Sequence, residues 1–426
     1  MTPRREADAS QFSFEGLVRP GDTVVCGQVC AEPLTLTRRL VADANRMSMP
    51  LQVFVGTLFS DTFDVAPENM RFLSYGAIGR ASVLADRGAL DIVPEPYSRL
   101  SSVFTDGKVA SDVVLLQAVE DEQGTLSFGL ACDYVLDAAR RARCVIVELN
   151  SAVPWTYGTR WPVDLRVDLW VRSDAAPLEL APSKDDPVAT TIGRNVASIV
   201  PDGATLQVGV GSLPDATLKA LSSHRHLGLH SGVLGDAAAA LIERGVIDNS
   251  MKNADAGISV ANTLCGSQRS YRLAHRNHAI EVRHSHYTHA AGALARLSRF
   301  HAINGALEVD LSGQVNCEML QGKQRGGIGG LPDFARAARA GSGGRSITVL
   351  PATAAGGNSS RIVSSLGGRP ATIGRADVDT VITEFGVADL RGVPMRERAR
   401  RLIAIAAPDK REQLSREYRD RGGKLE

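Results

Sequence analysis

The chain of 426 residues is 44% hydrophobic and 22% charged, which is typical of a globular protein, and its length favours two domains over one core. Its 48 basic and 47 acidic residues leave a net charge of +1, whereas proteins that bind nucleic acid or membrane surfaces usually carry a marked basic excess. We therefore expect neither nucleic acid nor a membrane among its partners.

The first residues, MTPRREADASQ, are charged and lead into no apolar segment, so we expect no signal peptide. No apolar run in the sequence reaches the length that spans a membrane. The six cysteines are scattered and lie mostly within apolar runs, which indicates reduced core residues in a chain of this size. These observations predict a cytoplasmic protein.

Residues 20–40, PGDTVVCGQVCAEPLTLTRRL, predict a strand, a glycine turn and a helix that begins near Pro33. Continuous apolar runs at residues 51–55, 113–117 and 145–148 predict further strands. Strands of a parallel sheet are covered on both faces, so they need not alternate between apolar and polar residues. Helical stretches between these runs favour βαβ units.

The second half of the chain repeats this order of signals. Residues 201–221, PDGATLQVGVGSLPDATLKAL, have the same strand, glycine turn and proline-led helix as residues 20–40. Residues 133–147 and 333–350 form a second matching pair, in which an Asp and an aromatic residue start an Ala- and Arg-rich helix that leads into an apolar strand. We infer a tandem duplication with halves near the usual domain size.

Hydrophobic periodicity lapses at residues 172–186, where Pro, Ser and charged residues gather. We place a boundary there, between an N-terminal domain of residues 1–185 and a C-terminal domain of residues 186–426. A buried strand at residues 378–383 and a charged helix at residues 395–406 close the second domain. The expected fold class is α/β, with two similar open domains and ligand-binding glycine loops at the carboxyl ends of their strands.

The most distinctive stretch is residues 325–350, which begins with a glycine loop. It runs into Pro332 and Asp333, which suit the first turn of a helix. Free N–H groups of such a loop and the positive end of the helix together provide a site for an anion or an oxyanion. The glycines that allow a ligand to approach this backbone closely are Gly326, Gly327, Gly329 and Gly330.

Two other patterns suggest sites less strongly. The loop Gly209-Val-Gly211 lacks the third glycine of a dinucleotide-binding loop, so a tight turn is favoured over a nicotinamide site. His284, His286 and His289 are close enough in sequence to suggest a metal. On a strand, however, the first two would share one face and His289 the other, and no Glu or Cys frames them, so we predict no metal site.

Several motifs together resemble the acetyl-CoA hydrolase / 4-hydroxybutyrate CoA-transferase family over nearly the whole chain. In the first half they are FLSYGAIGR at residues 72–80 and DVVLLQA at 112–118. In the second half they are GVGSLPDATLKAL at 209–221, LGLHSG at 227–232, INGALEVDLSGQVN at 303–316, GGIGGLPDF at 326–334, SRIV at 360–363 and TEFGVADLRG at 383–392.

This resemblance implies two similar α/β domains that enclose an active-site cleft, and a nucleophilic mechanism. In this family a glutamate carboxylate attacks the thioester to give an acyl anhydride and then a glutamyl-CoA thioester, which a second carboxylate resolves. By the same resemblance, N–H groups of residues 326–330 would stabilise the oxyanion and Asn304 would position the acyl group. Ser360 and Arg361 would lie near the CoA.

The sequence departs from the family at the nucleophile, which follows a His-Ser or His-Thr pair. This chain has His230, Ser231 and then Gly232, which carries no side chain. No neighbouring acid is an obvious replacement, since Asp236 lies at what resembles a second acidic position of the family and Glu243 lies on the next helix. We therefore expect transfer through an enzyme anhydride to be lost.

Four outcomes stay open. Water in the space of the missing carboxylate would attack the thioester with His230 or Asp236 as general base, which would make the protein an acyl-CoA hydrolase, and we favour this outcome. The same pocket would also suit C–C bond chemistry beside the thioester, transfer of CoA by another carboxylate, or binding of a CoA ester without turnover. The resemblance further implies no permanently bound cofactor and a CoA thioester as substrate. A homodimer is expected only as the default for soluble enzymes.

Overall fold

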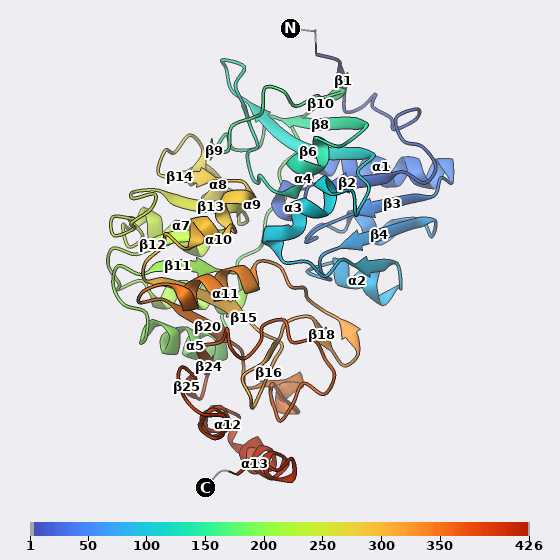
Figure 1. The fold of residues 1–426 in the computed structure, drawn as a ribbon. Helices are drawn as coiled ribbons and strands as arrows, with labels where there is room; N and C mark the ends of the chain where they lie inside the picture. The colour runs from blue at the N-terminus through green and yellow to red at the C-terminus, as the bar shows by residue number, and fades with distance from the viewer. Residues whose placement is uncertain (1–3, 425–426) are drawn as a thin grey trace.

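A computed structural model describes residues 4–424, and its centre is a pair of mainly parallel sheets, one in each half of the chain (Figure 1). The first has the strand order β1-β10-β8-β6-β2-β3-β4-β5, with β7 antiparallel to β6. Its strands are β1 (Glu6–Asp8), β2 (Thr23–Cys26), β3 (Leu51–Phe54), β4 (Met70–Ser74), β5 (Leu90–Ile92), β6 (Val113–Glu120), β7 (Leu126–Ser127), β8 (Cys144–Asn150) and β10 (Leu169–Ser173).

The second sheet has the order β25-β24-β20-β15-β11-β12-β13-β14-β9, and only the pair β24–β25 is antiparallel. Its strands are β9 (Tyr157–Gly158), β11 (Thr205–Val208), β12 (Gly228–Leu234), β13 (Ser259–Leu264), β14 (Ile280–Val282), β15 (Phe300–Gly305), β20 (Arg345–Val349), β24 (Thr380–Thr383) and β25 (Gly386–Asp389). Short pairings outside it involve β16 (Glu308–Asp310), β17 (Val315–Asn316), β18 (Met319–Leu320), β19 (Lys323–Gln324), β21 (Thr353–Ala354), β22 (Ser359–Ser360) and β23 (Ile362–Val363).

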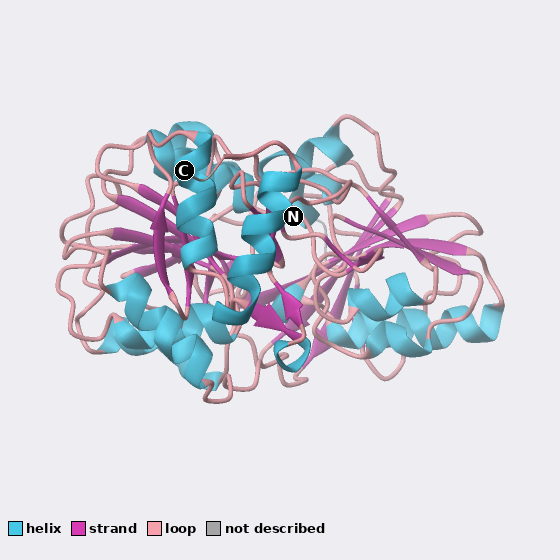
Figure 2. Ribbon diagram, turned by 90° about the horizontal axis from the view of Figure 1, so that it is seen from below, coloured by secondary structure: helices cyan, strands magenta, loops and turns pink. Residues whose placement is uncertain are grey.

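Helices pack along both sheets, whose strands gather at the two sides of the molecule in Figure 2. No helix of residues 4–424 is long and apolar enough to cross a membrane. The helices are α1 (Leu34–Met47), α2 (Ala81–Asp86), α3 (Tyr97–Thr105), α4 (Tyr134–Ala139), α5 (Pro187–Ala197), α6 (Ser212–Ala220), α7 (Asp236–Glu243), α8 (Gln268–Ala274), α9 (Ser285–Thr288), α10 (Ala291–Leu294), α11 (Leu331–Ala340), α12 (Met395–Ala404) and α13 (Arg411–Asp420).

The strands predicted from apolar runs are confirmed as β3, β6, β8, β20 and β24, and the charged helix near the end as α12. The apolar runs form strands because β6 and β8 lie in the middle of the sheet, where all but one of their residues are buried. Both pairs of matching segments predicted from the sequence are also present. In the first pair, β2 followed by α1 corresponds to β11 followed by α6, and in the second pair α4 followed by β8 corresponds to α11 followed by β20.

The two halves are not fully separate. The expected boundary at residues 185 and 186 falls between β10 and α5, but β9 of the first half pairs with β14 in the second sheet. One buried hydrophobic cluster also includes residues of both sheets, such as Phe54 and Leu229. The halves therefore share a core, and their relative position is set by buried apolar contact.

Loss of the Phe54 side chain should weaken this shared core. Phe54 is fully buried, and its ring lies 4.9 Å from that of Phe104 and 5.2 Å from that of Tyr134. We expect Phe54→Ala to lower the free energy of unfolding by about 3–5 kcal/mol, measured by chemical denaturation. The exposed Val163→Ala is the control, and equal denaturation midpoints for the two variants would contradict the packing described here.

Candidate active site

A cavity of about 230 Å³ opens where the carboxyl ends of strands from both sheets meet. Binding at the carboxyl ends of parallel strands is typical of open α/β sheets. The first half contributes Gln28, Val29, Thr57, Phe59, Tyr75, Ile78 and Tyr97, mostly from the segments that follow β2, β3 and β4. The second half contributes Gln207, Val208, Gly209, Val210, Gly232, Val233, Asn262, Thr263, His289, Asn304, Gly327, Ile328, Gly329, Gly330, Leu331 and Phe334.

A hydrogen-bonded network of polar side chains forms the wall of the cavity in the first half. The Gln28 amide accepts from the hydroxyl of Tyr75 at 2.9 Å and donates to the hydroxyl of Tyr97 at 2.7 Å. Tyr97 in turn donates to Asn262 of the second half at 3.1 Å. Burial raises the pKa of Tyr75 and of Tyr97 above the ordinary tyrosine value, so both stay protonated and act as hydrogen-bond donors.

Asn304 lies at the end of β15 and is held by Gln207 of β11. The two amides exchange a pair of hydrogen bonds, from Asn304 Nδ2 to Gln207 Oε1 at 2.9 Å and from Gln207 Nε2 to Asn304 Oδ1 at 3.1 Å. This reciprocal pairing fixes the orientation of Asn304 beside the cavity. Gln207 was not singled out from the sequence, because only the pairing of neighbouring strands brings it next to Asn304.

The glycine loop divides into a supporting part and a part that faces the cavity. Gly326 lies behind the cavity, where its carbonyl accepts from the N–H of Ala77 at 2.8 Å. Gly327, Gly329 and Gly330 line the cavity, and within the described chain their backbone N–H groups have no hydrogen-bond acceptor. Such free donors next to the start of α11 are suited to binding an oxyanion.

Gly232 faces the same cavity, and the imidazole of His289 lies beside it. A Cβ atom on Gly232 would be 3.3 Å from His289 Nε2, and one on Gly330 would be 2.7 Å from the same atom. The ring is thus seated between two residues without side chains. His289 contacts the rings of Tyr97 and Phe334, each with its centroid 4.6 Å away.

The electrostatics of the cavity are close to neutral. Burial lowers the pKa of His289 to about 3, so its imidazole is uncharged near neutral pH. None of the described residues that line the cavity is an Asp, Glu, Lys or Arg. The site therefore offers hydrogen-bond donors and one neutral imidazole, but neither a carboxylate nucleophile nor a fixed cation.

The two bases suggested by the sequence lie outside this cavity. His230 is 1% exposed, and its Nε2 lies 3.0 Å from the carbonyl of Thr288. Asp236 begins α7 and lines a neighbouring hollow, where it accepts from the N–H and hydroxyl of Ser267 at 3.0 and 2.5 Å. Burial opposes ionisation of Asp236, but the hydrogen bonds from Ser267 and Ser270 outweigh it and lower its pKa.

Ser360 and Arg361 also lie apart from the cavity. The Ser360 hydroxyl donates to the carbonyl of Ile362 at 2.6 Å and lines a hollow beside α13. Arg361 donates to the carbonyl of Leu307 at 3.3 Å. These two residues are not brought together with Gly232, so as CoA contacts they stay a prediction from resemblance.

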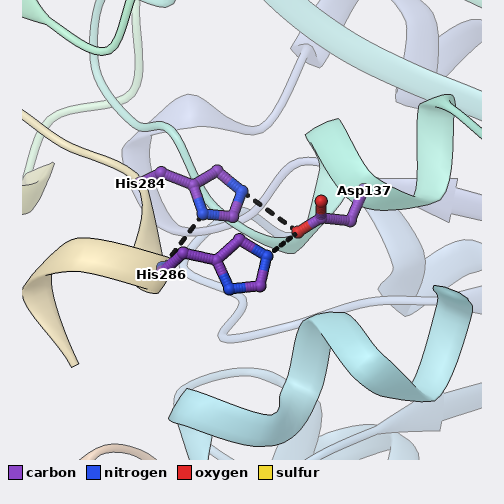
Figure 3. Close-up of side chains that lie close together, drawn as sticks. All are labelled: Asp137, His284 and His286. Carbon is purple, nitrogen blue, oxygen red and sulfur yellow. Dashed lines mark hydrogen bonds and ion pairs between the residues drawn. The ribbon is translucent and has the colours of Figure 1, made fainter. Parts of the chain in front are cut away.

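The local conformation expected for the His284–His289 segment was wrong. His284 caps α9, and the segment continues as a helix because the His284 ring accepts from the N–H of His286 at 3.0 Å. Asp137 from α4 approaches both rings, with Oδ2 3.1 Å from His284 Nε2 and 3.0 Å from His286 Nε2 (Figure 3). This carboxylate was invisible to local sequence reasoning because it comes from the other half of the chain.

These three side chains have the residue types of a metal site, with possible ligand atoms within 4.8 Å of one another, and both histidines lie within ion-pair distance of Asp137. Nδ1 of His284 accepts a hydrogen bond, so in the neutral ring the proton is on Nε2, which faces Asp137. Burial alone would raise the pKa of Asp137, but His284, Ser101 and His286 outweigh it and lower the pKa to about 2.

Comparison with known proteins decides the family. The acetyl-CoA hydrolase/transferase N-terminal domain matches residues 9–163, and the C-terminal domain of the same family matches residues 266–418. The chain belongs to the acetyl-CoA hydrolase/transferase family. Within this family, the 4-hydroxybutyrate coenzyme A transferase of Clostridium kluyveri is 38% identical over 78% of each chain. The succinyl-CoA:cyclohexane-1-carboxylate CoA transferase of Geobacter metallireducens is 32% identical over 96% of this chain and 94% of its own.

Solved structures agree with the family and the fold. RipA from Yersinia pestis superposes with a TM-score of 0.90 at 30% identity, over 98% of both chains. The 4-hydroxybutyrate CoA-transferase from Porphyromonas gingivalis gives 0.80 at 31% identity, again over 98% of both chains. The expected α/β fold of this acetyl-CoA hydrolase/transferase family member is thus confirmed.

A methyl group at position 330 should displace the imidazole of His289 from its packing position. Because that Cβ would lie 2.6 Å from His289 Cδ2, the imidazole must move, and we expect Gly330→Ala to cost about 1–3 kcal/mol of stability. Gly292→Ala on α10 is the matched control, since its added Cβ would meet open space. Thermal unfolding measures both, and equal melting temperatures would show that the imidazole does not rest on Gly330.

The Asp137 pair should contribute stability that depends on pH. With a pKa near 2 in the folded protein against an ordinary 3.8, Asp137 stabilises the fold above about pH 4, and this contribution is lost as the pH falls towards 2. Asp137→Asn should therefore lower stability near neutral pH by roughly 1–2 kcal/mol, with a difference that closes between pH 4 and 2. Denaturation at a series of pH values measures it; a difference that grows in acid would contradict the pairing.

Proposed function

We propose that this protein hydrolyses acyl-CoA thioesters in the cavity beside Gly232. The observation that carries the proposal is the absence of any Asp or Glu among the described residues that line this cavity. Ping-pong transfer of CoA needs a carboxylate to attack the thioester and to hold the acyl group and then CoA. A cavity without one favours direct attack by water.

The rest of the cavity suits a reaction at a thioester carbonyl. As the carbonyl carbon becomes tetrahedral, its oxygen gains negative charge that the free N–H groups of Gly327, Gly329 and Gly330 would stabilise. Each such donor typically contributes about 3–4 kcal/mol to the transition state. Asn304, fixed by Gln207, would hold the acyl group in place while water approaches.

The missing cations also disfavour transfer to a free acid. An acceptor carboxylate in this cavity would lose its hydration without meeting a Lys or Arg among the described lining residues. Water carries no such cost. Relatives in the family include proteins named acetyl-CoA hydrolase, such as that of Neurospora crassa, at 25% identity over 70% of this chain and 63% of its own.

We further propose that the acyl-CoA is the diffusible substrate, that no cofactor is bound permanently, and that the protein is a cytoplasmic homodimer. Ser360 and Arg361 would contact the CoA moiety away from the thioester. A different reaction beside the thioester, or binding without turnover, is the competing function.

The hydrolytic function is tested with a panel of acyl-CoA esters and a free-thiol assay, with and without acetate. We expect thiol release without acetate and no new acetyl-CoA by mass spectrometry, because no carboxylate is in place to carry the acyl group. Acetate-dependent exchange at a comparable rate would contradict hydrolysis and show that another carboxylate acts. If neither thiol release nor new acetyl-CoA is detected, with or without acetate, the competing function is favoured.

Restoring the carboxylate should restore the covalent step. In Gly232→Glu the new Cβ would lie 3.3 Å from His289 Nε2, so the ring needs to shift by only a few tenths of an ångström. We expect a glutamyl-CoA thioester that is visible as an intact-mass increase after incubation with acyl-CoA and is absent from the wild type. Gly232→Gln is the matched control because it has the same size without the nucleophile. An adduct in the wild type would contradict the proposed direct attack.

A further inference from the structure

His289 occupies the side of the cavity that a nucleophilic side chain at Gly232 would enter. Its Nε2 lies 3.3 Å from the Cβ position of Gly232 and faces the glycine loop at Gly330. Among the described residues, Nε2 of His289 has no hydrogen-bond partner, and the residue lines the cavity. This atom is therefore available to a small molecule held between Gly232 and the loop.

The other ring nitrogen is already engaged. His289 Nδ1 lies 2.8 Å from the Thr288 hydroxyl, which is also 3.4 Å from the carbonyl of His284. When the hydroxyl donates to that carbonyl, Nδ1–H donates to the hydroxyl and the lone pair is on Nε2, directed into the cavity. A fixed tautomer of this kind is what a histidine base requires.

The ring is also held in place by packing. Tyr97 and Phe334 flank it, and the two glycines at positions 232 and 330 leave room for it. His289 is 4% exposed, so few water molecules compete for Nε2. A base held this firmly does not need to reorganise during the reaction.

We infer that His289 is the general base that activates water for attack on the thioester. A water molecule bound to Nε2 adds its oxygen to the carbonyl carbon and gives its proton to Nε2, and the carbonyl oxygen becomes an oxyanion on the loop N–H groups. The C–S bond then breaks, and the CoA thiolate takes the proton back from the imidazolium. The sum is acyl-CoA and water giving a carboxylic acid and free CoA, with no oxidant, metal or further reactant.

This assignment rests on the proposed hydrolysis and replaces both bases suggested by the sequence. His230 has its Nε2 at the Thr288 carbonyl, and both carboxylate oxygens of Asp236 accept from Ser267. Burial lowers the pKa of His289 to about 3, so the base form is present over the whole neutral range. The hydrolysis rate should accordingly be nearly flat from pH 5 to 8, whereas direct attack by hydroxide would rise tenfold per pH unit.

The test is the variant His289→Asn, which keeps a polar atom near the Nδ1 position and removes Nε2. We expect kcat to fall by about 10-fold or more, less than the usual contribution of a positioned base, because a pKa near 3 makes His289 a weak base. The binding of a non-hydrolysable S-alkyl-CoA thioether should change little. His286→Asn in the adjoining helix α9 is the matched control, and it should retain the wild-type rate. Thermal unfolding of each variant checks that the fold is intact.

Two further measurements keep the outcomes distinct. His289→Ala should regain part of its activity with added imidazole, because the base is restored in the space that the ring leaves. Reaction of the wild type with diethyl pyrocarbonate should modify His289, and the S-alkyl-CoA should protect it, as peptide mass spectrometry shows without any turnover. Full activity in His289→Asn, with active wild type, would overturn the base assignment alone. A wild type that releases no thiol from any ester would overturn the hydrolytic function, and modification of His289 unaffected by the thioether would overturn its contact with the ligand.

Discussion

The site depends on the backbone hydrogen bonds that join the two halves of the chain, and we call this line of contacts the seam. The N–H of Ala77 donates to the carbonyl of Gly326 at 2.8 Å, and the N–H of Tyr97 donates to that of Gly329 at 2.9 Å. At this seam a Cβ on Gly76 would lie 2.6 Å from Gly327 Cα, so only glycines allow the two backbones to approach so closely. These bonds occupy the carbonyls of Gly326 and Gly329, whereas the N–H groups of the cavity-lining glycines at positions 327, 329 and 330 have no acceptor among the described residues.

The same seam brings a buried polar network into the site. Ser98 donates through its N–H and hydroxyl to Asp333 at 3.0 and 2.6 Å, which ties the start of α3 to the start of α11. Tyr97 therefore reaches both Gln28 and Asn262, one from each half. Most polar groups in this wall are paired with one another, as buried polar groups must be.

The effect of a missing side chain depends on which atoms occupy the space that it would have filled. From the sequence alone, the family resemblance predicts a carboxylate where this chain has Gly232, and the simplest expectation is a vacant site. In the folded protein the neighbouring volume belongs to the imidazole of His289, which could not sit there beside a bulkier residue at position 330. We propose that a neutral base at this position takes the place of the charged nucleophile that the resemblance predicts.

The sequence alone determined the α/β class, most of the buried strands, the internal duplication and the family. It did so because apolar runs, glycine turns and multi-residue motifs are local signals that survive in any tertiary context. It also placed Gly232, Asn304 and the glycines at positions 327, 329 and 330, which the fold brings to one cavity.

Only the tertiary structure decided which ionisable groups accompany them. His289 lies in the turn after α9 and lines the cavity. The Asp236 carboxylate instead accepts hydrogen bonds from Ser267, and His230 Nε2 lies at the carbonyl of Thr288. Asp137 lies 147 positions before His284 in the sequence, so no local pattern predicts the pair. Side-chain partners between sheets depend on how two surfaces dock, and that is set by the packing of the whole shared core and not by any one segment.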